Sequence, residues 1–493
     1  MRGIYTPVTQ IRRQVFKKVA KLAFSYEGDF SHIDELPYEI IKGEVASYRE
    51  SVFKERAIVA ERIRLASGLS VRTADEHAPL SRDFKQAIST SRVYEAPLIN
   101  VIPFACNACD ETSYVVTNNC RNCLAHPCTS VCPVKAVSIV DGHSVIDKEK
   151  CVRCGRCAEF CPYDAIIKYD RPCAAACGVN AIESDYLGRA TINPEKCVSC
   201  GQCLVACPFA AIADKSQIFQ LILALKEKDS NIIAEIAPAF VGQFGPLATP
   251  NKIKAALLEI GFKDVYEVAL GADDGAIEEA DHFIKKVPNE LPFLATSCCP
   301  SWSVLAKSFF PELSDCVSDS LTPMVATARI IKKKHPDAKI VFVGPCASKK
   351  LEAYRKTVKS DVEFVITFEE LMGIFAAKDI DFTKECDQTV EDAAATGRGY
   401  AIAGGVADAI VSCIKLKNPE ITVNVDRAEG LANCKKMLML AKAGKRNGYL
   451  LEGMACEGGC IGGAGTLQPI KKAAIQVKKF ADESPYKNAL DKK

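Results

Sequence analysis

The stretch Thr296-Ser297-Cys298-Cys299-Pro300-Ser301-Trp302 places two cysteines side by side. Neighbouring side chains on an extended or turning backbone point in different directions, so one thiolate can bind a metal while the other faces a reacting volume. We therefore predict that Cys299 is a metal ligand and that Cys298 carries protons. The rest of the chain must then supply the other ligands and the electrons.

Composition narrows the class of protein. The chain has 493 residues, enough for two to four domains and a large core. Hydrophobic residues make up 48% and charged residues 25%, as in ordinary soluble globular proteins. The net charge of +2 gives no reason to expect nucleic acid or a membrane surface as a partner. The first residues lack the apolar core of a secretory signal, so we expect a cytoplasmic location.

The 25 cysteines indicate metal rather than disulfides, because the chain is long and shows no export signal. None precedes Cys106, sixteen lie between Cys106 and Cys207, and nine follow. This distribution predicts three parts: a helical N-terminal region (1–95), a ferredoxin-like iron–sulfur module (96–214) and an α/β domain (215–493).

Two copies of one cysteine pattern fall in the middle part. Residues 151–162 and 197–208 both read Cys-x2-Cys-x2-Cys-x3-Cys-Pro, the bacterial ferredoxin pattern for 4Fe–4S clusters. Residues 120–133 carry the same pattern with an enlarged loop, and residues 172–177 retain only its end. The spacing therefore predicts two ferredoxin units of two clusters each, with Cys106 and Cys109 as the pair left to complete the second.

The fourth cysteine of such a pattern ligates the other cluster of its unit. This exchange predicts four ligand sets: Cys120, Cys123, Cys128 and Cys161; Cys151, Cys154, Cys157 and Cys132; Cys197, Cys200, Cys203 and Cys177; and Cys106, Cys109, Cys173 and Cys207. If Cys106 and Cys109 are instead structural thiols, three clusters remain.

The N-terminal region shows helical periodicity and no catalytic motif. Apolar residues keep helical spacing from Tyr38 to Leu69. Basic residues gather near the start of the chain, at Arg12, Arg13, Lys17, Lys18 and Lys21. This patch is typical of a solvated helix face; a docking surface for an acidic electron carrier is the alternative interpretation.

The C-terminal part alternates short β-rich runs with helical patterns, which predicts layers of parallel sheet. The runs are 231–237, 264–269, 292–296, 339–343 and 400–403. A helix is expected from Trp302 to the residue before Pro311. The Lys-rich tail from Lys471 indicates a solvated helix or a frayed end.

Nine cysteines lie in this part, in two kinds of context. Four are isolated, and we expect them to be buried small hydrophobic residues: Cys316, Cys386, Cys413 and Cys434. The others lie in the opening stretch, in the loop 344–350 directly after a predicted strand, and in the glycine-rich segment 452–465. There, the spacing of Cys456 and Cys460 predicts two thiolates on one face of a helical turn.

These three loops, in this order, resemble the signature loops of the FeFe (iron-only) hydrogenases over roughly residues 215–470. The active site of that family, the H-cluster, is a 4Fe–4S cubane joined through one cysteine to a two-iron centre with carbon monoxide, cyanide and a dithiolate bridge. The resemblance implies that Cys299, Cys346, Cys456 and Cys460 hold the cubane. Cys460 would also bridge to the two-iron centre.

The resemblance also implies roles for the residues around the cluster. Lys349 would donate a charge-assisted hydrogen bond to a cyanide, and Met454 would pack beside the two-iron centre. Cys298 would exchange protons with the bridge, since a thiol pKa lies near enough to neutrality to give and take them. The proton relay of the family would continue through Glu279, Ser318 and, at the position of the next acid, His282.

Several positions depart from the family pattern. Ser301 replaces a glycine, Gly344 and Met324 replace a methionine and a glutamine, and Glu457 replaces a proline. Ala239 stands where the family often has serine or another small polar residue. Residues of this kind surround the two-iron centre without binding it. We expect them to shift redox tuning, catalytic bias or oxygen sensitivity, and to mark a divergent subgroup.

The implied function is reversible oxidation of dihydrogen and reduction of protons. Electrons would pass along the 4Fe–4S clusters to or from ferredoxin or a similar carrier, and maturation proteins would build the two-iron centre. No dinucleotide-binding motif is evident. Two alternatives stay open: a dihydrogen sensor on the same domain, and a non-catalytic hydrogenase-like protein of cluster assembly or protein interaction. A plain polyferredoxin would not explain residues 215–493.

Overall fold

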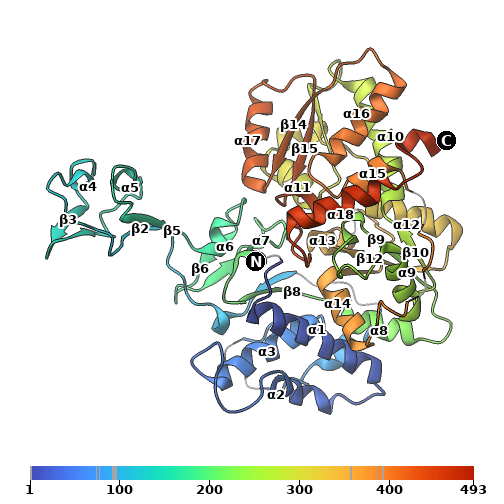
Figure 1. The fold of residues 1–493 in the computed structure, drawn as a ribbon, viewed down its shortest axis with the longest axis horizontal. Coiled ribbons are helices and arrows are strands. Elements are labelled where there is room, and N and C mark those ends of the chain that lie inside the picture. The colour runs from blue at the N-terminus through green and yellow to red at the C-terminus, as the bar shows by residue number, and fades with distance from the viewer. Residues whose placement is uncertain are drawn as a thin grey trace.

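The computed structural model describes residues 3–73, 75–76, 78–90, 97–355, 358–385, 387–390 and 393–492. Figure 1 shows N-terminal helices on one side, a cysteine-rich arm that projects from the molecule, and two sheets wrapped by helices. Among the described residues, no helix is both long and apolar enough to cross a membrane.

The first sheet has four parallel strands in the order β10-β9-β12-β13. Their bounds are Asp264–Glu267, Ile232–Ile236, Lys339–Gly344 and Phe364–Thr367. Nearly every residue in these strands is buried, because helices cover both faces of a parallel sheet. The second sheet, β11-β15-β14, is also parallel, with bounds Phe293–Ala295, Tyr449–Met454 and Asn424–Glu429. The predicted α/β fold with parallel layers is thus confirmed.

Eleven helices accompany these sheets within the described residues after 214. They are α8 (Ile218–Lys226), α9 (Pro250–Glu259), α10 (Ala269–Lys286), α11 (Pro300–Phe309), α12 (Pro323–Lys334), α13 (Ser348–Tyr354), α14 (Phe368–Ala377), α15 (Ala395–Gly399), α16 (Gly405–Lys417), α17 (Leu431–Lys442) and α18 (Ile470–Asp482). α11 is the helix expected after Trp302, and it ends before Pro311. α18 is the expected tail helix, but it buries Val477 and Phe480 rather than lying free in solvent.

One predicted strand is wrong. Residues 400–403 form a turn directly after α15, and Gly404 then begins α16 in a left-handed conformation. The residues of this run are apolar because they are buried, not because they pair in a strand. Tyr400 and Ala401 both face the interior. Short apolar runs do not distinguish a buried strand from a buried turn.

The N-terminal region is helical, as expected, but its helices are shorter than the periodicity suggests. They are α1 (Pro7–Ser25), α2 (Leu36–Ile40) and α3 (Val52–Ala66). The side chain of Ser51 accepts a hydrogen bond from the backbone N–H of Phe53 and so starts α3. Val45, in the irregular segment before it, is 85% exposed. The helical spacing seen in the sequence from Tyr38 to Leu69 is therefore interrupted in the structure by the irregular segment between α2 and α3.

The basic patch on α1 is not a continuous open surface. Arg12 forms an ion pair with Glu369, and Lys18 forms one with Glu39. Lys17 lies 3.8 Å from Asp379. α1 packs against α14 and α8, so part of its basic face is turned into the protein. This arrangement gives little support to the docking-surface interpretation.

The cysteine-rich part contains one ferredoxin unit inserted into another. The inner unit is closed by β1 (Ile99–Val101) pairing antiparallel with β8 (Ile212–Asp214). It also contains η3 (Pro103–Ala105), α6 (Pro172–Ala175), β6 (Ile182–Ser184), β7 (Ala190–Ile192) and α7 (Gln202–Ala206). The outer unit, residues 113–169, is the inserted one. Its segment of chain lies between Cys109 and Cys173 of the inner unit.

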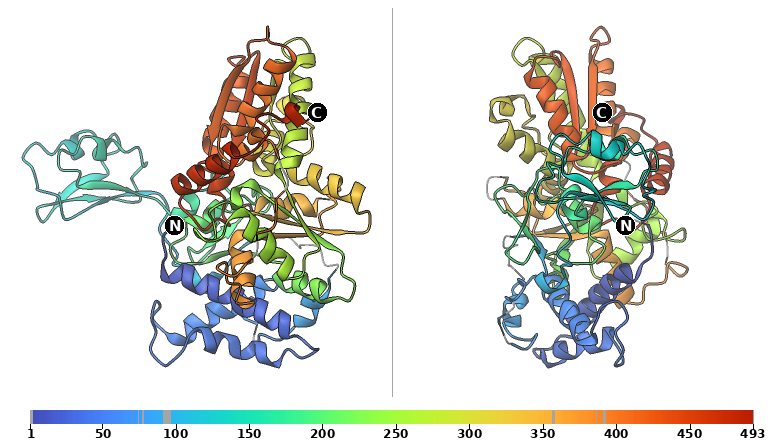
Figure 2. Two further views of the ribbon diagram at one scale, coloured as in Figure 1. Left: turned by 45° about the vertical axis from the view of Figure 1, so that its right-hand side comes forward. Right: turned by 90° about the vertical axis from the view of Figure 1, so that its left-hand side faces the viewer.

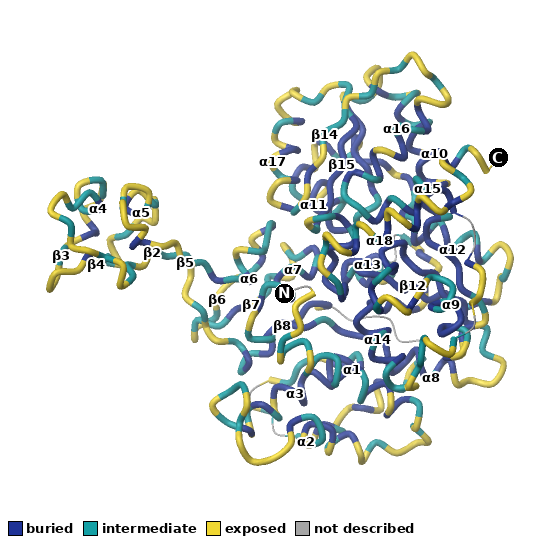
Figure 3. Tube along the Cα trace, viewed as in Figure 1, coloured by how far each residue is buried: buried dark blue, intermediate teal, exposed yellow. Residues whose placement is uncertain are grey.

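The outer unit is closed in the same way, by β2 (Ser113–Val116) pairing antiparallel with β5 (Ile166–Tyr169). Between them lie α4 (Pro127–Ser130), the hairpin β3 (Val137–Val140) and β4 (His143–Ile146), and α5 (Arg156–Glu159). The left-hand view of Figure 2 shows that this unit projects from the rest of the molecule. In Figure 3 its trace is largely exposed or intermediate, whereas the inner unit adjoins buried chain.

The isolated cysteines behave as expected where the structure describes them. Cys316, Cys413 and Cys434 are buried. Cys386 lies outside the described residues.

Candidate metal centre

A cavity lies where the loops after β11, β12 and β15 meet. Because β12 belongs to the first sheet and the other two strands to the second, the cavity lies at the junction of the sheets. The carboxyl ends of parallel strands commonly form such sites. Five cysteines from the three signature loops line it: Cys298, Cys299, Cys346, Cys456 and Cys460.

Cys299 is held at the start of α11. It is the residue immediately before the helix, and Pro300 occupies the first helical position. Burial raises the pKa of the Cys299 thiol, and backbone N–H groups of Ala455 and Trp302 oppose that rise by donating toward its sulfur. The same donors would stabilise a metal-bound thiolate. The loop therefore presents Cys299 as a preorganised anionic ligand.

Trp302 fixes the loop that carries Cys298 and Cys299. Its indole Nε1–H donates to the carbonyl of Thr296 over 2.9 Å, and its side chain is fully buried. Gly453 lies against the ring so closely that a Cβ there would come within 2.2 Å of it. Only glycine fits that position, so β15 and α11 can approach closely enough to close the cavity.

Cys346 follows β12 and precedes α13. Burial raises the pKa of this thiol to about 11, while the Lys349 cation and the N–H groups of the next turn act in the opposite direction. The Lys349 ammonium lines the cavity and donates to Glu352 over 2.6 Å, with both side chains buried. An ammonium has three donors, so this ion pair leaves Lys349 able to donate into the cavity as well.

Cys456 and Cys460 are not on one helical turn, which corrects the prediction from their spacing. The chain turns between them through Gly458 and Gly459, both with φ near 80°, and only then enters the short 3-10 helix η6 (Gly459–Gly462). Left-handed backbone of this kind strongly favours glycine. Both thiols reach the cavity by this turn, and burial raises the pKa of Cys460 to about 12.

Two of the predicted proton-relay residues, Glu279 and Ser318, lie near Cys298. Glu279 comes from α10 and is 4% exposed, and burial raises its pKa to about 7. The Ser318 hydroxyl donates to the Glu279 carboxylate, and the backbone N–H of Ser297 donates to its Oε1 over 3.3 Å. The charges of Glu279 and Cys298 influence each other. A carboxyl group that titrates near neutrality can both accept and release a proton.

His282 is the least well connected of the predicted relay residues. It lies one turn after Glu279 on α10 and is half-buried. Its side chain forms no hydrogen bond with a described residue, and its neighbour Asp281 pairs with Lys417 over 2.6 Å. The structure thus brings Cys298, Glu279 and Ser318 together, and leaves His282 beyond them toward the surface.

Met454 lines the cavity, as the sequence suggested, and two further lining residues were missed. Tyr400 belongs to the run misread as a strand; its hydroxyl is buried without a partner among the described residues. Cys200, predicted only as a ferredoxin ligand, also lines this cavity. No local pattern could have placed either residue here, because both arrive from distant segments of the chain.

The inner ferredoxin unit is joined to the cavity by specific contacts. The side-chain amide of Gln202 donates to the sulfur of Cys456 over 3.0 Å. The hydroxyl of Ser301 donates to the carbonyl of Val198 over 2.9 Å, with both residues buried. Ser301 is one of the positions that depart from the family pattern. Here it ties α11 to the 197–203 cysteine loop.

Other departures also occupy the cavity wall. Met324 and Ala239 line it directly. Gly344 lies against the Phe342 ring, which also lines the cavity and would lie 2.3 Å from a Cβ at position 344. Glu457 is exposed and is not among the residues that line the cavity. The expectation that these substitutions surround the reacting volume therefore fits Met324, Ala239 and Ser301 but not Glu457.

In each predicted group, cysteines line a common cavity or raise a neighbour's pKa, while their assignment as ligand sets stays a prediction. One group lines a small cavity of the outer unit and another lines one of the inner unit: Cys120, Cys123, Cys128 and Cys161; and Cys106, Cys109, Cys173 and Cys207. In the third group, burial and then the thiols of Cys151, Cys132 and Cys154 raise the pKa of Cys157. In the fourth, burial and then the thiols of Cys200, Cys197 and Cys177 raise the pKa of Cys203.

The donor set at the central cavity fits an iron–sulfur cluster. Thiolates are the ligands that iron–sulfur clusters use, and four of them converge here from three loops. The walls between them are mostly apolar, with Ala237, Pro238 and Met324 among them. A fifth thiol, Cys298, and the Lys349 ammonium face the same volume. The site can therefore hold a large anionic cofactor and supply both a proton donor and a cation to it.

Comparisons with known proteins match both parts of this architecture. Residues 230–464 match the iron only hydrogenase large subunit, C-terminal domain, and residues 144–167 and 190–213 each match the 4Fe-4S binding domain. Iron hydrogenase 1 from Clostridium pasteurianum is 28% identical over 392 residues, which span 68% of this chain and 67% of that protein.

Two other matches are more distant. The nuclear prelamin A recognition factor of Xenopus laevis is 24% identical over 325 residues, 52% of this chain and 70% of that protein. A solved FeFe-hydrogenase from Chlamydomonas reinhardtii is similar to 56% of this chain and 92% of its own, with a TM-score of 0.45 and 22% identity.

Proposed function

Since this chain is a divergent FeFe-hydrogenase-like iron–sulfur protein, we propose that it catalyses the reversible oxidation of dihydrogen and reduction of protons. The observation that carries this proposal is a fifth thiol, Cys298, beside the four that suit a cubane. Structural iron–sulfur binding needs four thiolates only. The fifth lies close enough to the buried Glu279 carboxyl group for their charges to interact, which suits proton exchange with the cavity.

The proposed cofactor is an H-cluster held by Cys299, Cys346, Cys456 and Cys460. When bound, it would supply the redox-active, Lewis-acidic iron at which dihydrogen is cleaved or formed. Lys349 would hold the cofactor by hydrogen bonding to an anionic ligand, and Met454 and Met324 would keep water from the two-iron side. Three to four further 4Fe–4S clusters would occupy the cysteine groups of the inner and outer units.

The proton route proposed here begins at the Cys298 sulfur and passes to the Glu279 carboxylate. Ser318 keeps that carboxylate oriented through its hydroxyl hydrogen bond. A pKa of about 7 allows Glu279 to change protonation state at neutral pH without a large energetic cost. His282, one turn further along α10, is proposed as the next group toward solvent.

The electron route proposed here runs through the outer unit, the inner unit and then to the cavity. Cys200 is the shared element, since it belongs to a ferredoxin group and also lines the central cavity. A ferredoxin-type carrier is proposed as the partner, together with maturation proteins for the two-iron centre. The domain limits at residues 95 and 214 and the cytoplasmic location stay predictions.

Infrared spectroscopy tests the proposal directly. After maturation with a two-iron precursor, bands of iron-bound carbon monoxide and cyanide should appear, and Cys298→Ala should keep them while turnover is nearly abolished. Cys316→Ala is the control, because that cysteine is buried away from the cavity. Full activity of Cys298→Ala would disprove its role as the proton carrier.

The main rival is a non-catalytic iron–sulfur protein. A relative named as a prelamin A recognition factor keeps this rival open. Complete iron loading without any carbon monoxide or cyanide band would favour it over the hydrogenase. The sensor alternative rests on the altered wall at Met324 and Ser301, and intact bands with very slow turnover would support it.

A further inference from the structure

A polar chamber lies where the N-terminal helices meet the rest of the chain. α1 and α3 line one side, and the inner unit and residues 464–468 line the other. Its volume is about 230 Å³, and it shares no lining residue with the central cavity. A space of this size admits a small ligand together with water.

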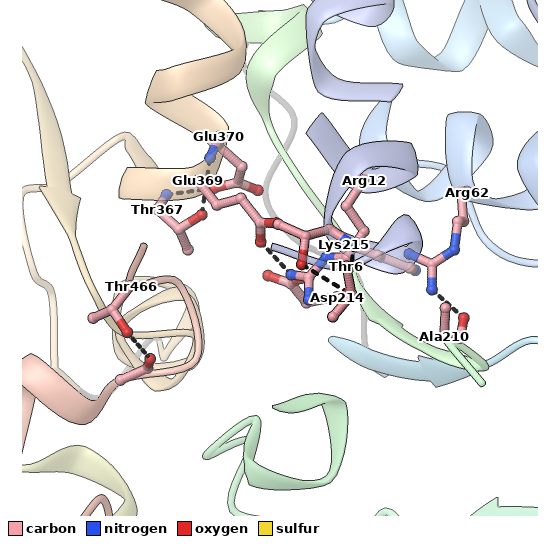
Figure 4. A network of polar contacts seen from close by, with 12 residues as sticks. Thr6, Arg12, Arg62, Ala210, Asp214, Lys215, Thr367, Glu369, Glu370 and Thr466 are labelled. Carbon is pink, nitrogen blue, oxygen red and sulfur yellow. Dashed lines mark hydrogen bonds and ion pairs between the residues drawn. The ribbon is translucent and has the colours of Figure 1, made fainter. Parts of the chain in front are cut away.

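The chamber carries an excess of positive charge. Arg12 and Arg13 of α1 and Arg62 of α3 line it, and Glu369 is the acidic side chain among the lining residues. Figure 4 shows Arg12 and Arg62 entering from two different helices. Arg12 forms an ion pair with Glu369. Arg13 and Arg62 form no ion pair with a described residue of the wall.

Both of these arginines keep a buried donor unused. The Nε–H groups of Arg13 and Arg62 have no hydrogen-bond partner among the described residues. Arg62 is only 6% exposed, although its terminal nitrogen donates to the carbonyl of Ala210. A buried charged donor without a partner is costly, and a bound group that accepts from it would remove that cost.

Two other polar side chains of the wall already donate to backbone carbonyls. The Thr466 hydroxyl donates to the carbonyl of Gly463 over 2.9 Å. The Gln468 amide donates to the carbonyl of Gln243 over 3.2 Å. Among the described lining residues, the buried side-chain atoms left without a hydrogen-bond partner are therefore the two guanidinium Nε–H donors, which favours an anion with several acceptor oxygens.

We propose that this chamber binds a small dianionic oxyanion of the phosphate type, held by Arg13 and Arg62. Guanidinium groups suit phosphate because their planar donors match its oxygens. Free phosphate and the phosphate group of a small metabolite present the same chemistry. Residues 3–5 form an exposed part of the wall, so a larger body could extend from the phosphate toward solvent.

The bound anion would also be linked to the nearest ferredoxin cluster. Cys207 lines the chamber and its charge acts on Arg62. A negative charge near the cluster opposes its reduction, and by reciprocity reduction weakens anion binding. This linkage rests on the proposed cluster at Cys207; the binding itself does not rest on the proposed function.

Calorimetric titration of the intact, iron-loaded chain with inorganic phosphate, at constant ionic strength, tests the site. We expect one phosphate per chain, with affinity reduced at least about tenfold in Arg13→Gln and in Arg62→Gln. Lys17→Gln is the matched control, because Lys17 is on the same helix, does not line the chamber and pairs with Asp379. Its affinity should equal that of the unmodified chain.

The outcomes are distinct. The site would be overturned if neither phosphate nor glycerol 3-phosphate bound saturably. It would also be overturned if both arginine variants bound phosphate as tightly as the unmodified chain does. If Arg62→Gln does not fold, Arg13→Gln decides. Tighter binding of glycerol 3-phosphate supports a metabolite as the source, and binding of phosphate alone supports the free ion. Equal phosphate affinity of the oxidised and dithionite-reduced chains would overturn the linkage, whatever the hydrogenase activity.

Discussion

The inner and outer ferredoxin units share one pattern but differ in what surrounds it. The buried core of the outer unit consists of Cys128, Val137, Cys157 and Ile166. The inner unit packs into larger cores that include residues of α3 and of the signature loops. Burial raises the pKa of Cys200 to about 12, whereas Cys154 of the outer unit is exposed.

This contrast suggests a division of work between the units. The reduction potential of an iron–sulfur cluster depends on its solvent exposure and on hydrogen bonds to its sulfurs. The exposed outer unit is suited to meet a carrier. The buried inner unit is suited to deliver electrons to the cavity, because Gln202 and Ser301 connect it there.

Loss of the inner cluster nearest the cavity should have the largest effect. Cys200→Ser removes a thiolate from both the inner group and the cavity wall. We expect loss of about four irons per chain and nearly complete loss of carrier-driven hydrogen turnover. Iron analysis and activity with reduced ferredoxin measure this. Cys154→Ser is the matched variant in the outer unit, and an equally complete loss there would contradict the proposed division.

Excision of the outer unit should have a more selective effect. Its two ends lie together, since the Thr112 hydroxyl donates to Asp170 over 2.6 Å, so a short glycine linker can replace residues 113–169. Iron content should fall by about eight per chain. Turnover with a small artificial dye should persist while turnover with ferredoxin falls. If the shortened chain used ferredoxin as well as the full chain does, the outer unit would not be the entry point.

The outer unit also illustrates what sequence patterns can supply. Its cysteine spacing predicts which cysteines lie near one another, because such spacing is local; their role as cluster ligands stays a prediction. The insertion of one unit into the other was partly readable from the unpaired Cys106 and Cys109. The contact of Cys200 with the cavity was not readable, because it depends on packing between segments about a hundred residues apart. Tyr400 was missed for a related reason: a buried turn and a buried strand can have the same run of apolar residues in the sequence.

In the α/β domain too, local sequence patterns predicted some features of the structure and missed others. The α/β fold followed from periodicity, since alternating strand and helix patterns imply parallel sheets. The turn at Gly458 and Gly459 could not be predicted from the sequence pattern, because a Cys-x3-Cys spacing fits either a helix or a glycine turn. Resemblance identified Glu279, while its unusual pKa arises only from tertiary burial.

Burial also acts on Glu279, and its effect depends on pH. Burial raises its pKa from 4.5 to about 7, so between these values the folded chain holds one more proton than the unfolded chain. The free energy of unfolding should then fall by roughly 3 kcal/mol as pH rises through this window. The contribution is complete below pH 4.5 and lost above about pH 7.

Infrared difference spectroscopy can measure this titration. The band of a protonated carboxyl group should disappear near pH 7 in the unmodified chain and be absent in Glu279→Gln. Glu278→Gln is the control, since that neighbour is exposed. A band that disappears near pH 4.5 would show that burial does not perturb Glu279, and the proposed proton route would lose its neutral relay.

The smallest expected effect concerns the link between the inner unit and the cavity. Ser301→Ala removes the donor to the buried Val198 carbonyl, which should destabilise the 197–203 loop by about 1 kcal/mol. Amide hydrogen exchange in that loop should then quicken about fivefold, while the outer unit is unchanged. Ser303→Ala, on the same helix but without such a bond, should leave exchange as it is. Unchanged exchange in Ser301→Ala would mean that packing around Gly201, whose Cβ would meet Ala464 at 2.7 Å, holds the inner unit in place without the hydroxyl. The departure at Ser301 would then concern the cavity wall alone, and the contrast between the two units would depend on burial rather than on hydrogen bonding.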